Sequence, residues 1–171
     1  MLSGLDKPTS GRVFLQDKDI TDTSEDDLAQ LRKDMIGFVF QSFHLIPSLT
    51  ALENIMFPAE LKHDPAALEK AKHLLQRMGL DKRSANFPHQ LSGGEMQRVA
   101  MCRALINNPK IIFADEPTGN LDSENGHAIL ELLLDYQKES RTTLVLVTHS
   151  INIAKMADRM IFLQDGRITS G

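Results

Sequence analysis

Short apolar runs separated by helical patterns dominate the second half of the chain. The runs at 36–40, 110–114 and 143–147 are almost wholly apolar, which is typical of strands buried in a parallel sheet. Before the last run, a helix is predicted to start at Asp122 or Ser123. Its apolar positions are Ile129, Leu130, Leu132, Leu133, Leu134 and Tyr136. Helices that alternate with apolar strands predict an α/β fold whose parallel sheet is covered on both faces.

Helix-start signals are frequent in the first half. A Ser or Thr followed three positions later by an acidic residue is typical of a helix start, and it predicts helices at about 24–32 and 50–61. Asp-Pro at the start of 65–78 and Gly79 at its end predict a third helix. The segment from about 44 to 98 is therefore mostly helical, and we expect it to form a subdomain inserted into the sheet.

The two ends of the chain are predicted to be extended. Residues 1–22 should form two extended pieces around a turn at 7–11, which is rich in Pro, Ser and Gly. At the other end, a short helix is expected at about 151–157. A hairpin should follow, formed by 160–163 and the residues around Gly166.

Length and composition narrow the class of protein. A chain of 171 residues with 42% hydrophobic residues predicts one globular domain. The net charge of -4 argues against nucleic acid as the main partner, and no apolar run approaches the roughly 18 residues of a membrane span. With no signal-peptide pattern and one cysteine, Cys102, which is expected to be buried, the predicted compartment is the cytoplasm.

The segment Leu91–Arg98 carries the first candidate chemistry. Gly93 and Gly94 precede a predicted helix from Glu95 to about Leu105, so free backbone N–H groups and the positive end of a helix dipole face outward. Phosphate suits this position, and the hydroxyl of Ser92 adds a donor. The alternative is an ordinary helix start beside a buried strand.

Two carboxylates follow the central apolar run. Ligands of open α/β sheets bind beyond the carboxyl ends of the strands, which is where Asp115 and Glu116 are expected. Asp115 is placed to hold Mg²⁺ directly or through water, and Glu116 to orient or deprotonate an attacking water. The alternative is a pair of solvated acids at a strand end.

The runs LSGGEMQR and IIFADEPTGNLD, in that order, resemble the signature motif and Walker B motif of ATP-binding-cassette (ABC) ATPases. The resemblance extends over essentially the whole chain and is greatest to the bacterial lipoprotein-release and macrolide-efflux group. It implies a P-loop NTPase-like parallel sheet flanked by helices. The implied single, partial domain has a core of 1–43 and 99–171 and a helical subdomain at about 44–98.

The resemblance also implies roles for individual residues. Gln41 would contact Mg²⁺ and the attacking water and couple the site to a membrane partner, and His149 would grip the γ-phosphate. Ser92 and Gly94 would close over the nucleotide held by a second subunit. The implied nucleotide-contacting set is Ser92, Gly93, Gly94, Gln97 and Asp122.

The function implied is that of an ATP-hydrolysing transporter subunit with ATP and Mg²⁺ as cofactors. Its partners would be an integral-membrane permease and a second ABC ATPase in a head-to-tail dimer, at the inner face of the cell membrane. Export or lipoprotein release is favoured over nutrient uptake. A DNA-repair-type ABC ATPase fits less well, because the sequence has no sustained heptads.

The sequence departs from the family at the phosphate-binding loop. It contains no G-x-x-x-x-G-K-[ST], and it begins just after the place where the family carries that motif. We expect the 171 residues alone to hydrolyse ATP poorly, to be marginally stable and to leave core surface uncovered. Either the sequence is a fragment of a complete subunit, or it is a non-hydrolytic subunit that donates its signature to a complete partner.

Overall fold

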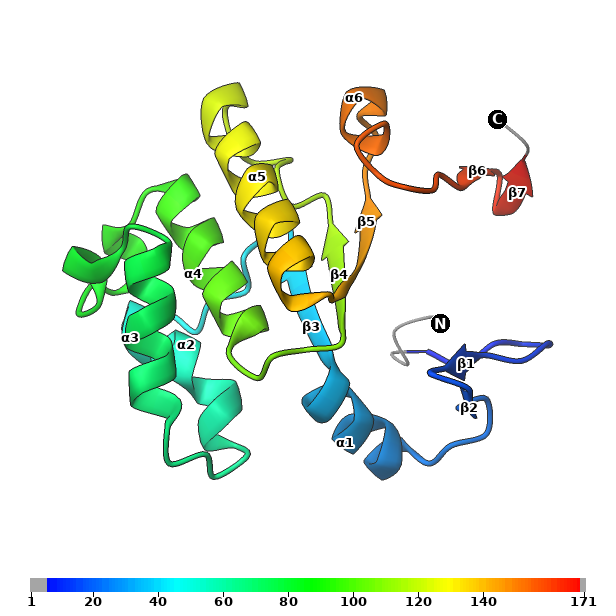
Figure 1. Cartoon of the computed structure of the whole chain (residues 1–171), viewed down its shortest axis with the longest axis horizontal. Coiled ribbons are helices and arrows are strands. Elements are labelled where there is room, and N and C mark those ends of the chain that lie inside the picture. Colours follow the sequence, from blue (N-terminus) through cyan, green and yellow to red (C-terminus); the bar gives the residue numbers. More distant parts are fainter. Residues whose placement is uncertain (1–5, 170–171) are drawn as a thin grey trace.

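A three-stranded parallel sheet forms the centre of the computed structural model, which describes residues 6–169 (Figure 1). Its strands, in spatial order, are β3 (Ile36–Phe40), β4 (Ile111–Asp115) and β5 (Thr143–Val147). All three predicted strands are confirmed, the central one beginning one residue later than expected. The α/β class and the parallel core are therefore confirmed.

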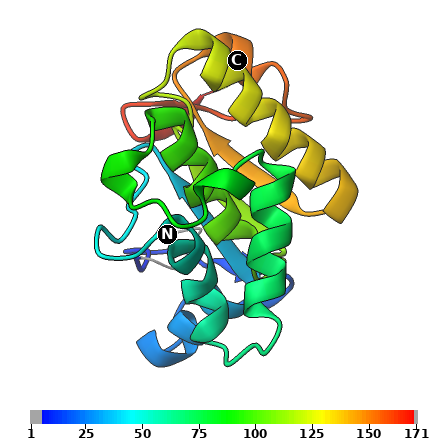
Figure 2. The ribbon, with the colours of Figure 1, turned by 90° about the vertical axis from the view of Figure 1, so that its left-hand side faces the viewer.

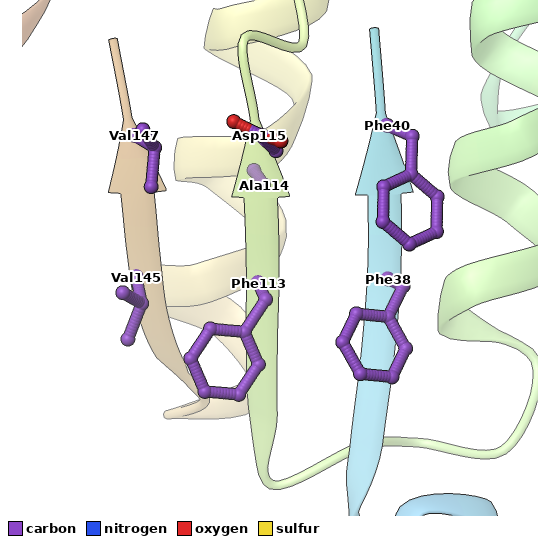
Figure 3. A pocket seen from close by; sticks show the side chains of 7 residues that line it. All are labelled: Phe38, Phe40, Phe113, Ala114, Asp115, Val145 and Val147. Carbon is purple, nitrogen blue, oxygen red and sulfur yellow. The ribbon is translucent and has the colours of Figure 1, made fainter. Parts of the chain in front are cut away.

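The two faces of this sheet differ in how they are covered. Side chains alternate between the faces, so Val39, Ile112 and Ala114 lie together on one face and are fully buried. Helices α4 (Gly93–Leu105) and α5 (Ser123–Ser140) cover that face. The other face, within the described residues, is an open hollow lined mainly by Phe38, Phe40, Phe113, Val145 and Val147 (Figure 3). Coverage of both faces is therefore a wrong prediction for this part of the chain, whereas the expected uncovered core surface is present.

The helices that precede the signature pack against α4 (Figure 2). They are α2 (Ala51–Glu60) and α3 (Ala67–Arg77), followed by the short 3₁₀ turns η1 (Asp81–Arg83) and η2 (Pro88–Gln90). The predicted capping box at the start of α2 is present. Helix α3 begins two residues later than predicted, because the Asp64 side chain accepts a hydrogen bond from the Ala66 N–H and forms a turn there. The buried residues of these helices and of the sheet's covered face make one continuous core.

A smaller core lies at the other end of the sheet. The elements there are β1 (Phe14–Leu15), β2 (Lys18–Asp19) and α1 (Glu25–Met35), and the core residues are Leu15, Ile20, Leu28 and Leu31. Helix α1 starts after its predicted Ser24 cap and runs three residues further than expected. The hairpin of β1 and β2 turns at Gln16 and Asp17, both at positive φ, and the turn predicted at 7–11 is present before β1 as bends at 9–11. Residues 1–5 of the predicted extended segment lie outside the described part of the chain.

The last part of the chain is exposed. It consists of α6 (Ile151–Ala154) and the predicted hairpin of β6 (Phe162–Gln164) and β7 (Arg167–Thr169). The hairpin turns at Asp165 and Gly166, both at positive φ, as expected for an Asp-Gly turn. Helix α6 is shorter than predicted. None of the helices in residues 6–169 has the length and apolar character that crossing a membrane requires.

Candidate functional site

The carboxyl ends of the three strands bring the predicted hydrolytic residues to one edge of the sheet. The register pairs Phe40 with Asp115, and Asp115 with Val147. Gln41 follows β3 directly, Glu116 follows β4, and His149 comes two residues after β5. The parallel register therefore places side chains from three separate stretches of sequence side by side, as the sequence predicts for a ligand site.

Asp115 is exposed at this edge. It is the last residue of β4, and its carboxylate stands at the rim of the open hollow, on the side where the strands end (Figure 3). The described residues contain no group of three or more His, Cys, Asp or Glu side chains able to hold a metal ion. Mg²⁺, however, keeps several waters and is commonly bound by one or two protein oxygens together with substrate phosphates. The exposed Asp115 carboxylate is a protein oxygen ligand of this kind.

Glu116 links the ends of β4 and β5. Its backbone N–H donates to the Val147 carbonyl at 3.0 Å, and its carboxylate accepts a hydrogen bond from the His149 backbone N–H at 2.5 Å. Its φ of 43° is in the left-handed region, which non-glycine residues adopt rarely and which is frequent at functional sites. The Glu116 side chain is 19% exposed and the His149 side chain 97%, with 3.7 Å between Oε1 and Nε2. The imidazole is thus open to a ligand while its backbone is held by the carboxylate.

Gln41 is joined to the loop after β4 by a reciprocal pair of amide hydrogen bonds. Its Nε2 donates to Asn120 Oδ1 at 3.1 Å, and Asn120 Nδ2 donates to the Gln41 carbonyl at 3.0 Å. A Cβ on Gly119 would lie 2.7 Å from Gln41 Nε2, so a side chain at this position would displace the Gln41 amide. Asn120 is part of the quoted motif, but its partner could be found only from the fold.

The signature segment starts helix α4 at Gly93, two residues earlier than predicted. Ser92 caps α4 and accepts from the Glu95 N–H, and Glu95 in turn accepts from the Ser92 N–H at 2.8 Å. That backbone hydrogen bond, followed by the nearby Arg83 guanidinium, holds the pKa of Glu95 below its ordinary value. The N–H groups of Gly93 and Gly94, at the first two helical positions, have no acceptor within the helix. Ser92 is exposed and Gly93 partly exposed, whereas Gly94 is buried, so the open part of this helix terminus is at Ser92 and Gly93.

Close packing against the start of α5 favours glycine at position 94. A Cβ on Gly94 would come within 2.9 Å of Asn125 Oδ1, near the start of α5. Asp122 caps α5, accepting from both the backbone and the side-chain amide of Asn125, and these bonds lower the pKa of its carboxyl. The segment after Walker B therefore packs directly against the signature.

Gln97 lies in the interior. It is fully buried, and its Nε2 donates to the Pro117 carbonyl at 2.7 Å and, less closely, to the Phe40 carbonyl at 3.4 Å. Its Oε1 has no hydrogen-bond partner. The side chain predicted to contact nucleotide is thus occupied in joining α4 to the ends of β3 and β4, and it presents no surface to a ligand.

Two residues that the sequence analysis did not identify hold the loop after β3. Arg103 donates to the carbonyls of Phe43 and His44, at 2.8 and 2.5 Å, and burial lowers the pKa of its guanidinium. Buried Asn54 donates to the carbonyls of Ile46 and Leu49 and accepts from the Ile46 N–H. Both residues occupy ordinary helical positions in the sequence, so only the tertiary contacts distinguish them. By contrast, Cys102 is buried as predicted, and burial raises the pKa of its thiol to about 12.

Comparisons with known proteins agree with this geometry. The family described as ABC transporter matches residues 1–119. The ABC transporter ATP-binding protein MJ0796 of Methanocaldococcus jannaschii is 48% identical over 170 residues, which cover 96% of this chain and 72% of that protein. The lipoprotein-releasing system ATP-binding protein LolD of Idiomarina loihiensis is 44% identical over 168 residues, which cover 97% and 74%.

Solved structures give the same result. A dimeric structure of the ATP-binding cassette MJ0796, in a post-hydrolysis state bound to ADP and Pi, aligns with a TM-score of 0.89 at 44% identity. The alignment covers 98% of this chain and 75% of that one. A second dimeric structure of the same cassette aligns with a TM-score of 0.88 at 46% identity.

Proposed function

The chain belongs to the ABC transporter family, and from this premise we propose that it is the ATP-hydrolysing subunit of a transporter that exports material or releases lipoproteins. One observation carries the proposal. Gln41, Asp115, Glu116 and His149 share one edge of the parallel sheet, with the signature helix packed beside it. The similarity to two LolD proteins, each 44% identical to this chain, supports the assignment to the lipoprotein-release type.

The residues at the edge have separable roles. Asp115 is exposed and would hold Mg²⁺, which supplies charge neutralisation on the phosphates when bound. Glu116 would orient or deprotonate the attacking water through Oε2, because the His149 N–H occupies Oε1 and Oε2 has only a 3.5 Å contact with the Thr148 hydroxyl. The exposed imidazole of His149 would contact the γ-phosphate, and the Gln41 amide would contact both the water and the metal ion.

The signature acts on a second subunit in this proposal. Ser92, Gly93 and Gly94 would close over the triphosphate held by a partner ATPase in a head-to-tail dimer, and Asp122 would lie near the dimer interface. The related cassette MJ0796 is dimeric in its solved structures. An integral-membrane permease completes the assembly, which places the chain on the inner face of the cell membrane.

The 171 residues lack the motif that anchors the nucleotide phosphates in this family. They contain no G-x-x-x-x-G-K-[ST], the motif whose backbone and lysine cradle the β- and γ-phosphates. We expect a polypeptide of these residues to hydrolyse ATP slowly or not at all by itself. A second candidate follows from the intact signature terminus: the chain could donate Ser92–Gly94 to a partner that carries the complete motif.

The test mixes this chain with a complete ABC ATPase subunit whose own signature has been inactivated. Restored ATPase activity would support the signature's role in trans, and no restoration would remove it. Ser92→Asn and Ser92→Asp form a matched pair, because both retain a good helix cap but only aspartate adds a negative charge facing phosphate. Ser92→Asn should retain most of the rescue and Ser92→Asp should abolish it.

A second measurement tests the hydrolytic site of the chain itself. Millimolar Mg-ATP should not raise the melting temperature of the 171-residue chain, because binding that stabilises the fold needs a phosphate anchor. A clear stabilisation would contradict the expected poor binding. Loss of that stabilisation in Asp115→Asn would then locate the bound metal ion.

A further inference from the structure

The loop after β3 has an unusual backbone for residues with side chains. Phe43 and His44 are consecutive and have φ values of 57° and 48°, in the left-handed region. Two such residues in succession are disfavoured for L-amino acids and persist where surrounding contacts hold them. The loop also carries Gln41, two residues before Phe43, so whatever holds Phe43 and His44 also fixes where Gln41 lies.

The holding contact comes from Arg103. Its two terminal nitrogens donate to the two carbonyls of these left-handed residues, which uses the planar fork of the guanidinium. In residues 6–169 the ion pairs do not include Arg103, although its burial lowers the pKa of the guanidinium. A charged side chain that is half-buried without a carboxylate is costly, and here its donors serve the loop backbone.

Arg103 lies on the same helix that begins at the signature. Helix α4 thus contacts both loops of the hydrolytic edge, through Arg103 to the loop after β3 and through Gln97 to the loop after β4. Those two loops are joined to each other by the Gln41–Asn120 amide pair. A displacement of α4 would therefore move Gln41 through a chain of direct contacts.

We propose that Arg103 is a positioning residue for Gln41: it fixes the Gln41 amide against Asn120 by holding the Phe43–His44 backbone. The inference rests on the proposed function only in giving Gln41 a role in hydrolysis. The positioning itself can be measured without nucleotide.

The experiment follows the side-chain amide signals of Gln41 and Asn120 by NMR in the 171-residue chain. Gln41→Ala assigns the Gln41 signal by its loss. In Arg103→Met, which keeps the apolar stem without the donors, both signals should move to the positions of free amides. Backbone amides at 43–45 should exchange with solvent about tenfold faster or more, because their loop opens locally.

Asn107→Ala is the matched control. Asn107 follows α4 and donates to the Pro58 carbonyl at 3.2 Å, so it also joins this helix to neighbouring backbone, but not to the loop after β3. It should leave the Gln41 and Asn120 signals in place. Unmoved signals in folded Arg103→Met, or equal movement in Asn107→Ala, would overturn the proposal.

Arg103→Lys decides the outcome if Arg103→Met does not fold. Lysine keeps the charge but not the fork, so only one carbonyl can be held well and the Gln41 signal should shift part of the way. An unchanged signal in Arg103→Lys would also overturn the proposal. Failure of the proposed function would appear instead in the ATPase and thermal-shift measurements, which this experiment does not use.

Discussion

The covered and open faces of the central sheet are both largely apolar but lie in different environments. On the covered face Val39, Ile112 and Ala114 are fully buried beneath α4 and α5. On the open face Phe38 and Phe113, whose ring centroids are 5.9 Å apart, line a hollow that no described helix covers. Apolar residues in a strand therefore show that a face is suited to burial, and only the fold shows what buries it.

The largest effect is expected from removing a side chain on the covered face. Ile112→Ala should lower the free energy of unfolding by about 3 kcal/mol, because a fully buried side chain is lost and a cavity remains. Phe113→Ala, one residue away on the open face, should cost about 1.5 kcal/mol, since its ring is only partly removed from water. Urea denaturation measures both, and equal losses would contradict the difference between the faces.

A smaller loss of stability is expected from adding a methyl group where α4 approaches β3. A Cβ on Gly37 would lie 2.5 Å from the Ala104 backbone oxygen, which cannot move without shifting the helix. Gly37→Ala should therefore lower the free energy of unfolding by about 2 kcal/mol. A wild-type denaturation midpoint for this variant would show that α4 is not packed tightly on the sheet.

The cap of α4 should give a modest, pH-dependent effect. The pKa of Glu95 is lowered in the folded state, so its contribution is complete above its ordinary pKa of about 4.3 and is lost as the pH falls through the lower folded value. Glu95→Gln should cost less than about 1 kcal/mol at pH 7, and the difference from wild type should be smaller at pH 3 than at pH 7. Denaturation curves at both pH values test this.

Glu53→Gln in α2 is the control for that measurement. Its capping box lowers the pKa of Glu53 through the Thr50 N–H in the same direction, but among the described residues it has no cation comparable to Arg83. The change with pH should have the same sign and be smaller. A larger change for Glu53→Gln would show that Arg83 adds nothing to the cap of α4.

The smallest effect is expected on the open face. Val145→Thr keeps the strand-forming, β-branched shape and adds a hydroxyl that water can reach, so stability should change by no more than about 0.5 kcal/mol. The same substitution should slow aggregation, which light scattering measures. A loss comparable to that of Ile112→Ala would mean that this face is covered in solution.

Periodicity and capping predicted much of this fold because they act locally. The three strands, the Ser24 and Thr50 caps and the Asp-Gly hairpin were all found from short stretches of sequence. The turn at Gln16 and Asp17 was missed because both residues are in left-handed conformations, which glutamine rarely adopts. Coverage of the sheet failed for another reason: it depends on which elements pack on each face.

The edge of the sheet was predicted from motifs, and its internal contacts were not. Parallel strands bring their carboxyl ends together, so grouping Gln41, Asp115, Glu116 and His149 needed only the strand assignment. The Gln41–Asn120 pair joins residues 79 positions apart, and the Arg103 contacts span about 60. No local pattern contains such pairings. The burial of Gln97 was also not predicted, because a polar residue within a ligand-binding motif is expected to contact the ligand.

The alignment of Phe40, Asp115 and Val147 across the sheet has a consequence for how the protein tolerates insertions. One added residue within β4 would turn Asp115 toward the helices and carry Glu116 a step beyond the partners supplied by β5. An added residue in the segment joining α2 to α3 would move nothing at this edge. Insertions and deletions should therefore be tolerated between the helices, whereas the three short strands should keep their lengths.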